Sequence, residues 1–195
     1  IDTLIPADAN TLVLSNGAYG RRMAKICKIH KRSYVVFETE EDVSPTGIQV
    51  STILREDKSI THVLAVHCET TSGILNPISE ISEAVTTAGR QLIIDAMSSF
   101  GALDLNMSKL KCTAVVASSN KCLEGVPGVG FAIIDRTVLE NSEKNATSLS
   151  LDLFDQWQNF KETGQWRFTP PTHVLAALGQ ALNEHETDGG VQGRR

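Results

Sequence analysis

Short apolar runs alternate with helix-like segments along most of this chain, and this alternation constrains the fold more than any other feature. The runs are bounded by polar and turn-forming residues and are too short for buried helices, so each predicts a strand. The segments between them predict helices, the third with Pro77 in its first turn and Gly89 at its end. The expected strands are 11–14, 34–37, 62–66, 92–94, 113–116 and 130–134, and the expected helices are 20–30, 47–55 and 77–89.

A repeat of strand, helix and strand predicts one α/β domain with a mostly parallel sheet, right-handed crossovers and helices on both faces. The link between Val116 and Gly130 is too short for a helical crossover, so the last strand is expected to run antiparallel to its neighbours. Farther along, the pattern predicts a helix at 151–157, an extended loop at 164–168 and a longer helix at 171–186.

Two chemically active side chains follow predicted strands. Asp95 ends one apolar run, and Lys121 comes shortly after another, just before a glycine-rich stretch. Ligands of parallel sheets bind beyond the carboxyl ends of the strands, where both residues are expected. An amine and a carboxylate at that edge match pyridoxal 5′-phosphate, which needs a lysine for a Schiff base and an acid to keep its pyridinium nitrogen protonated.

Each of these residues has a simpler interpretation when it is taken alone. An aspartate after a strand is more often a turn or helix cap, and a lysine is more often a surface residue. Their joint position favours the cofactor. In that role the acid supports an electron-accepting ring, and the lysine, once displaced by an amino substrate, acts as the general base.

Composition excludes several other classes of function. The net charge is −5, and no basic stripe or tail is present to bind nucleic acid. No apolar run approaches the ~20 residues that span a bilayer, so a soluble, cytoplasmic chain is expected. The four cysteines have neither Cys-x-x-Cys spacing nor histidine partners, which predicts reduced thiols and no metal site. Cys122, next to Lys121, is left open as a reactive thiol.

Six motifs carry a resemblance to a known family. They are LSNGAYG at 14–20, HCETTSG at 67–73, DAMSSFG at 95–101, SNKCLEGVPG at 119–128, LSLDLFDQW at 149–157 and WRFTPPTH at 166–173. Together they resemble the class V, fold-type I aminotransferases that use pyridoxal phosphate, and among these the 2-aminoethylphosphonate:pyruvate transaminases. The resemblance implies that an amino group passes from 2-aminoethylphosphonate to pyruvate, giving phosphonoacetaldehyde and alanine.

The resemblance also implies roles for individual residues. Lys121 matches the Schiff-base lysine and Asp95 the acid at the pyridinium nitrogen. Tyr19 matches the aromatic residue stacked on the cofactor ring, and Met97 the apolar residue on the other face. Thr70 matches a hydroxyl near the phenolic oxygen of the cofactor.

Two further matches concern the phosphate of the cofactor. Asn120 resembles a group that reaches this phosphate, and Thr169 resembles one that reaches it from a second subunit. The resemblance therefore implies a homodimer. Loop amides and hydroxyls also serve commonly as caps and turns, which is the alternative for both residues.

The resemblance implies that the chain lacks parts of the family's fold. The family's main phosphate-binding turn would precede Ile1, and its small C-terminal domain, with the arginine for the acidic group of the substrate, would follow the chain. Residues 1–186 are then expected to form part of the cofactor-binding large domain and 187–195 the start of a connection, so neither Arg194 nor Arg195 is assigned that role. The alternatives are a sibling enzyme, such as an alanine or serine:glyoxylate transaminase, and an inactive fragment that acts as a scaffold. A desulfurase is disfavoured because no suitable cysteine loop is present.

Overall fold

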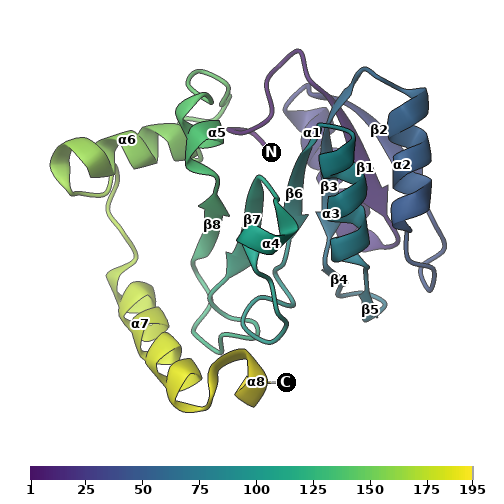
Figure 1. Cartoon of the computed structure of the whole chain (residues 1–195). Helices are drawn as coiled ribbons and strands as arrows, with labels where there is room; N and C mark the ends of the chain where they lie inside the picture. Colours follow the sequence, from purple (N-terminus) through teal and green to yellow (C-terminus); the bar gives the residue numbers. More distant parts are fainter. Residues whose placement is uncertain (195) are drawn as a thin grey trace.

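The computed structural model describes residues 1–194 and has a six-stranded sheet at its centre (Figure 1). The strand order is β2-β1-β3-β6-β7-β8. Its strands are β1 (Asn10–Ser15), β2 (Ser33–Glu38), β3 (Ile60–Val66), β6 (Gln91–Asp95), β7 (Ala114–Ser118) and β8 (Gly130–Ile134). All neighbours pair in parallel except β7 and β8, which are antiparallel. The predicted strands and the direction of the last one are confirmed.

Helices cover both faces of the sheet, which confirms the predicted α/β class. Helices α2 (Gly47–Glu56) and α3 (Ile78–Thr87) lie on one face, and α1 (Ala18–Ile29) lies behind the other (Figure 1). Successive side chains of a strand point to opposite faces. On β1, Leu12 therefore packs in the core beneath α2 and α3, whereas Val13 packs in the core beneath α1.

The C-terminal part consists of helices with few buried residues: α5 (Arg136–Glu140), α6 (Leu153–Thr163), α7 (Thr172–Thr187) and α8 (Gly190–Arg194). The helix predicted at 151–157 begins later because Asp152 is its N-cap and accepts from the N–H groups of Phe154 and Asp155. It also extends farther and ends at Gly164, where φ is 69°. The longer helix predicted at 171–186 corresponds to α7, with Pro171 as N-cap.

Several short elements are absent from the prediction. These are the antiparallel hairpin of β4 (Cys68–Glu69) and β5 (Ile74–Leu75), helix α4 (Met107–Leu110), and the short helices α5 and α8. Side-chain caps fix two of them: Asn106 accepts from two N–H groups at the start of α4, and Asp135 caps α5. Such elements are too short to show a repeating hydrophobic pattern, so the sequence carries no periodic signal for them.

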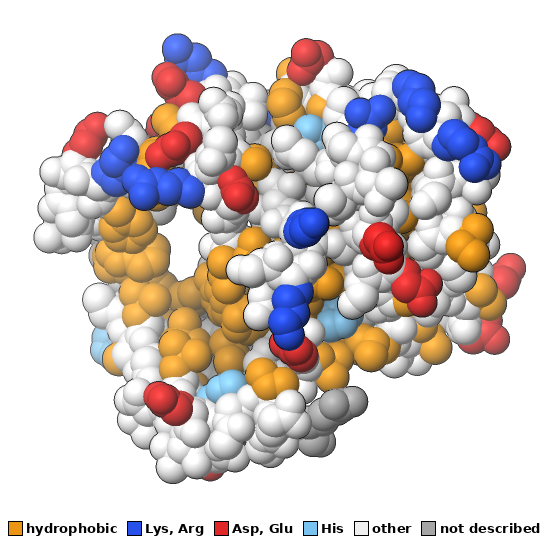
Figure 2. Space-filling view, viewed as in Figure 1, with side chains coloured by type: hydrophobic (Ala, Val, Ile, Leu, Met, Phe, Trp, Pro, Cys, Tyr) orange, Lys and Arg blue, Asp and Glu red, His pale blue; other side chains and the backbone are white. Residues whose placement is uncertain are grey.

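Large apolar side chains remain exposed around α6 and α7. Figure 2 shows hydrophobic side chains gathered about the hollow between these helices and β8. The exposed large apolar residues of β8, α6, α7 and the segments beside these helices include Ile133, Leu151, Leu153, Phe160, Trp166, Phe168 and Leu182. An apolar patch of this kind is typical of an interface. Among the described helices, none is long and apolar enough to cross a membrane.

Candidate active site

Four loops meet at the carboxyl edge of the parallel strands. The backbone N–H of Tyr19, after β1, donates to Glu69 Oε2 at 3.2 Å. Thr70, next to Glu69, has its hydroxyl 2.5 Å from that of Ser98, in the loop after β6. The Cys122 thiol, after β7, donates to the backbone oxygen of Ser98 at 3.3 Å. The loops that carry Tyr19, Thr70, Asp95 and Lys121 are therefore joined by direct contacts.

Asp95 is the last residue of β6 and is half-buried. Its Oδ1 accepts from the N–H of Met97 at 3.0 Å, and no described donor reaches Oδ2. Burial raises the pKa of the Asp95 carboxyl; the Met97 hydrogen bond opposes the rise, the charge of Glu69 adds to it, and the charge of Arg22 opposes it. Oδ2 of Asp95 can therefore accept a hydrogen bond from a further donor, such as a protonated nitrogen.

A cavity of about 300 Å³ adjoins Asp95 and Met97. Its lining is mostly apolar and includes Leu64, Ile93 and Val116 from the neighbouring strands β3, β6 and β7. A carboxylate beside such a surface is poorly solvated. Its interaction with a cation or a hydrogen-bond donor is therefore stronger than in water, because the local dielectric is low.

Lys121 lies in a tightly held loop after β7. Ser119 Oγ donates to the backbone oxygen of Val126 at 2.6 Å, and the N–H of Gly125 donates to Ser119 O at 2.8 Å. A Cβ atom at Gly125 would lie 2.8 Å from Ser119 O, so the turn requires glycine there. The Lys121 backbone oxygen accepts from the N–H of Glu124 at 2.8 Å. Among the described residues, none forms a hydrogen bond or an ion pair with Nζ, so a fixed backbone carries a free amine.

The neighbouring Cys122 links this loop to the one after Asp95. Its thiol is half-buried and donates to Ser98 O. In the same loop, Glu124 forms an ion pair with Arg194 of α8. Because Arg194 is also paired with Asp188 at 3.1 Å, its guanidinium is engaged within the chain. Arg195 lies outside the described residues.

Tyr19 is the second residue of α1 and is half-buried. The guanidinium of Arg22, one turn farther along the helix, lies 4.6 Å from the centroid of its ring, which is a cation–π contact. Thr70 is exposed between β4 and β5, and Asn120 is exposed next to Lys121, with no described hydrogen-bond partner for its side chain.

Thr169 is the one predicted site residue that the structure does not bring to this edge. It is exposed in the connection between α6 and α7, which Figure 1 shows on the far side of β8 from β6. No hydrogen bond among the described residues joins it to the other candidates. Within a single chain, Thr169 therefore stands apart from Lys121 and Asp95.

Sequence reasoning assigned no role to four residues that shape this edge. Glu69 is completely buried and bonds to the start of α1, and Ser98 touches two of the loops. Asn16 and Asn76 form a reciprocal amide pair with N···O distances of 2.9 and 3.1 Å, which fixes the end of β1 against the start of α3. A polar residue next to a strand end is only a weak sign that it holds two loops together, since its hydrogen-bond partner is distant in the sequence.

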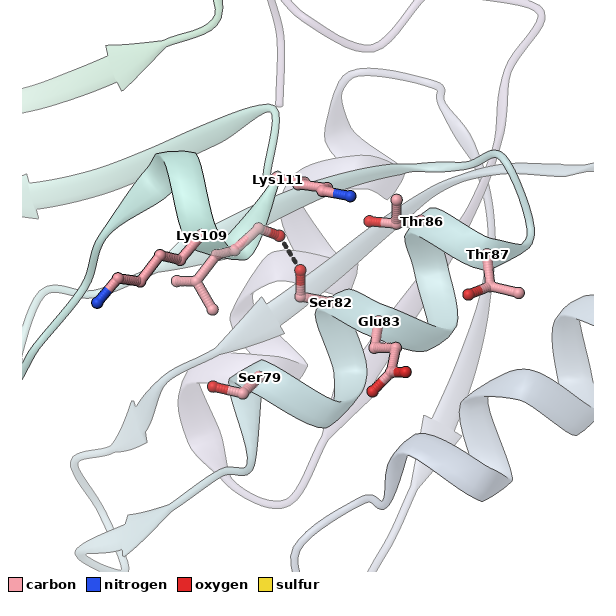
Figure 3. Close-up of a pocket in the computed structure, with 8 residues that line it drawn as sticks. Ser79, Ser82, Glu83, Thr86, Thr87, Lys109 and Lys111 are labelled. Atoms are coloured by element: carbon pink, nitrogen blue, oxygen red, sulfur yellow. Dashed lines mark hydrogen bonds between the residues drawn. The ribbon is translucent and has the colours of Figure 1, made fainter.

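A second groove lies between α3 and α4, away from the candidate residues (Figure 3). Its lining is polar and includes Ser79, Glu83, Thr87, Lys109 and Lys111. The Ser82 hydroxyl points at Leu110 and donates to its backbone oxygen, which ties α3 to α4 (Figure 3). We assign this groove a structural role. Among the described residues, no group of three or more His, Cys, Asp or Glu could hold a metal ion.

A family model described as aminotransferase class V matches residues 16–192, a span that includes every candidate residue. The chain belongs to the class V aminotransferases. Enzymes of this family depend on pyridoxal phosphate. The match confirms the resemblance found in the sequence motifs and places this chain in an enzyme family.

Curated relatives with a named activity are more than 50% identical to this chain. A 2-aminoethylphosphonate–pyruvate transaminase from Pseudomonas putida is 53% identical over 194 residues, which is all of this class V chain and 53% of the relative. The enzyme of the same name from Pseudomonas aeruginosa is 51% identical over 195 residues. The chain spans about half the length of the curated relatives it matches.

Solved structures share the fold. The pyridoxamine–pyruvate aminotransferase from Mesorhizobium loti superposes with a TM-score of 0.88 at 27% identity, covering 96% of this chain and 49% of that one. The ureidoglycine–glyoxylate aminotransferase from Bacillus subtilis gives a TM-score of 0.86 at 20% identity, covering 99% and 50%, and supports the fold alone.

Proposed function

We propose that the protein is a transaminase that uses pyridoxal 5′-phosphate and moves the amino group of 2-aminoethylphosphonate to pyruvate, giving phosphonoacetaldehyde and alanine. The observation that carries this proposal is the contact between Cys122 and Ser98, which puts the Lys121 loop beside the Asp95 loop. Identity above 50% to enzymes of that name, over the whole chain, supports the choice of substrates.

The residues at the sheet edge fit pyridoxal phosphate. Asp95 offers an uncommitted oxygen beside an apolar cavity, which suits a protonated ring nitrogen. Tyr19 offers an aromatic face, and Met97 an apolar side chain at the same cavity as Asp95. Thr70 and Asn120 offer exposed polar groups for the phenolic oxygen and the phosphate. When bound, the cofactor supplies an electron-accepting ring that stabilises negative charge on the substrate Cα.

Lys121 has two functions in this proposal. Its amine would hold the cofactor covalently between turnovers. After a substrate amine displaces it, Nζ would take the proton from the amine-bearing carbon of the substrate and deliver it to the cofactor, which lets the amino group leave the substrate. Both functions need an amine that is not tied up in an ion pair, and the described residues provide no partner for Nζ. The fixed backbone around it keeps the amine close to the same carbon throughout.

Asp95 supports the ring through its charge. Burial raises the pKa of this carboxyl, so the ionised form is less stable than in water, and a cation placed against it would offset that cost. A protonated ring nitrogen is such a cation. The pair would stabilise both the charge on Asp95 and the proton on the ring, and this proton is what allows the ring to accept electrons.

The proposed working unit is a cytoplasmic homodimer. The exposed apolar side chains around α6 and α7 are of the kind that an interface covers. Thr169 lies in the connection between these two helices and stands apart from the other site residues of its own chain, which suits a role at the cofactor phosphate of the partner. We take residues 1–186 as part of the cofactor-binding domain and 187–195 as the start of a connection, a segment that contains α8.

Amino-group transfer from 2-aminoethylphosphonate to pyruvate tests the function directly. Alanine formation should be much faster with this donor than with alanine or serine as donor and glyoxylate as acceptor. A preference for the second pair would instead favour a sibling class V transaminase, which the curated relatives support less. Absence of cofactor binding in the purified protein would favour a scaffold.

A further inference from the structure

Among the described residues of the sheet edge, Glu69 is the one carboxylate that is completely removed from solvent. It ends the short strand β4, and its oxygens accept hydrogen bonds from both sides. From α1 come the N–H groups of Tyr19, at 3.2 Å, and Gly20, at 3.4 Å. From its own turn come the N–H of Thr71 at 3.3 Å and the Thr71 hydroxyl at 2.7 Å. A buried carboxylate needs partners of this kind, because without them its desolvation is costly.

Helix α1 depends on Glu69 for its N-terminal cap. Its N-cap residue is Gly17, which has no side chain to accept from the free N–H groups of the first turn. Glu69 takes that role from another loop, and its charge is also favourable at the positive end of the helix. The close packing requires glycine at this position, since a Cβ atom at Gly17 would lie 2.5 Å from Glu69 Cδ and 2.8 Å from Thr71 Oγ1.

This arrangement joins two of the proposed cofactor contacts through one side chain. The Glu69 carboxylate fixes the backbone of Tyr19 directly, because it accepts a hydrogen bond from the Tyr19 N–H. Thr70 lies between Glu69 and Thr71, both of which are fixed by the same carboxylate, and its hydroxyl meets Ser98 in the loop after Asp95. The charge of Glu69 also reaches Asp95 on β6, where it adds to the rise in the pKa of that carboxyl.

We propose that Glu69 is a positioning residue of the active site, one that fixes Tyr19 and Thr70 relative to each other before the cofactor binds. The inference rests on the proposed function, since it takes these two residues as cofactor contacts. Groups held in place beforehand bind a ligand more tightly, because less order has to be created on binding. Loss of the Glu69 charge should therefore loosen both segments and weaken the cofactor, while the rest of the sheet keeps its structure.

Amide hydrogen exchange of the cofactor-free protein and pyridoxal phosphate titration of the same samples test this inference. In Glu69→Gln, exchange at the Tyr19, Gly20 and Thr71 amides should become about tenfold faster, since one charge-assisted acceptor serves all three. Amides of Leu64 and Ile93 in the core strands should keep their rates, which separates local loosening from loss of the fold. The Kd for pyridoxal phosphate should rise by about tenfold in parallel.

Glu83→Gln is the matched control, because Glu83 lies on the exposed face of α3 in the groove of Figure 3 and carries the same charge. It should change neither measurement. If Glu69→Gln does not fold, Thr71→Val removes the hydroxyl partner while keeping the carboxylate, and a smaller change of the same kind is expected.

Unchanged exchange at Tyr19 and Gly20 would overturn the inference, and so would faster exchange with an unchanged Kd. The proposed function fails on a different result. If the parent protein does not bind pyridoxal phosphate, or Lys121→Ala binds it with the same visible spectrum, the function is wrong whatever Glu69 does.

Discussion

The thiol of Cys122 donates a hydrogen bond to the backbone oxygen of Ser98, at a distance of 3.3 Å. Cys122 follows the proposed anchor Lys121, and Ser98 lies in the loop after the proposed ring acid Asp95. One contact between neutral groups therefore connects the two loops on which the proposed chemistry depends. The sequence left Cys122 open as a reactive thiol, whereas the structure gives its thiol a bonding partner within the fold.

Cys122→Ala is expected to weaken this connection and Cys122→Ser to preserve it. Alanine leaves the Ser98 oxygen without its donor, which should lower the free energy of unfolding by about 1 kcal/mol and reduce turnover several-fold. Serine keeps a donor at the same position and should stay close to the parent in both. Urea denaturation and steady-state kinetics of the pair measure the effect. Equal behaviour of alanine and serine would show that the contact does not hold the loops together.

Lys121→Ala should abolish the visible absorbance band that the parent protein gains with pyridoxal phosphate. The reason is that no other amine can form the same covalent bond to the cofactor from this position. Lys109→Ala is the matched control, because Lys109 is an exposed lysine in the groove between α3 and α4. A band retained in Lys121→Ala, or a borohydride-trapped label on another lysine, would overturn the assignment of the anchor.

Asp95→Asn should keep cofactor binding largely intact but slow removal of the substrate Cα proton by about a hundredfold or more. An amide can still accept the hydrogen bond from Met97, but it cannot support a protonated ring nitrogen through charge. Single-turnover rates at saturating cofactor measure the proton step. A near-normal rate would show that another group supports the ring.

Although Asp95→Asn should slow the reaction, it should raise the free energy of unfolding of the cofactor-free protein. Burial raises the folded-state pKa of Asp95 above its ordinary value of 3.8. The folded chain then binds this proton more strongly than the unfolded chain, so ionised Asp95 lowers stability as pH rises through the raised pKa. Asp95→Asn should therefore be more stable than the parent at neutral pH, and the gain should shrink as pH falls toward 4. Denaturation of the two cofactor-free proteins across this range gives the comparison.

Much of the fold could be predicted from the sequence because its signals are local. The strands are contiguous apolar runs, and the direction of β8 follows from the short link before it. Lys121 and Asp95 stood out because each follows such a run. Residues 69–73 also follow a predicted strand, but the sequence gave Glu69 no role, since its partners at Tyr19 and Gly20 lie far away in the chain and nothing local shows that the residue is buried. Long-range polar contacts of this kind have no sequence period.

His62 should make the protein less stable as the pH falls below neutrality. The residue lies in β3, its Nε2 has no hydrogen-bond partner among the described residues, and burial lowers its pKa from 6.5 to about 4. Between these values the unfolded chain binds a proton that the folded chain does not, so stability decreases with falling pH by at most about 3 kcal/mol. His62→Gln should flatten this part of the profile, as denaturation between pH 7 and pH 4 would show. An equally steep decrease in the variant would assign the effect to other groups.

Thr169→Ala should weaken pyridoxal phosphate binding only in an assembled dimer. The side chain is exposed and stands apart from Lys121 in its own chain, so an effect on the cofactor requires that the loop after α6 reaches the site of a partner. Loss of one hydroxyl hydrogen bond corresponds to about 1 kcal/mol, or roughly a fivefold rise in Kd. Light scattering gives the oligomeric state and titration gives the Kd, with Thr87→Ala as an exposed threonine control. A monomer that binds the cofactor as tightly as the parent, with no effect of Thr169→Ala, would remove the proposed contribution from the partner.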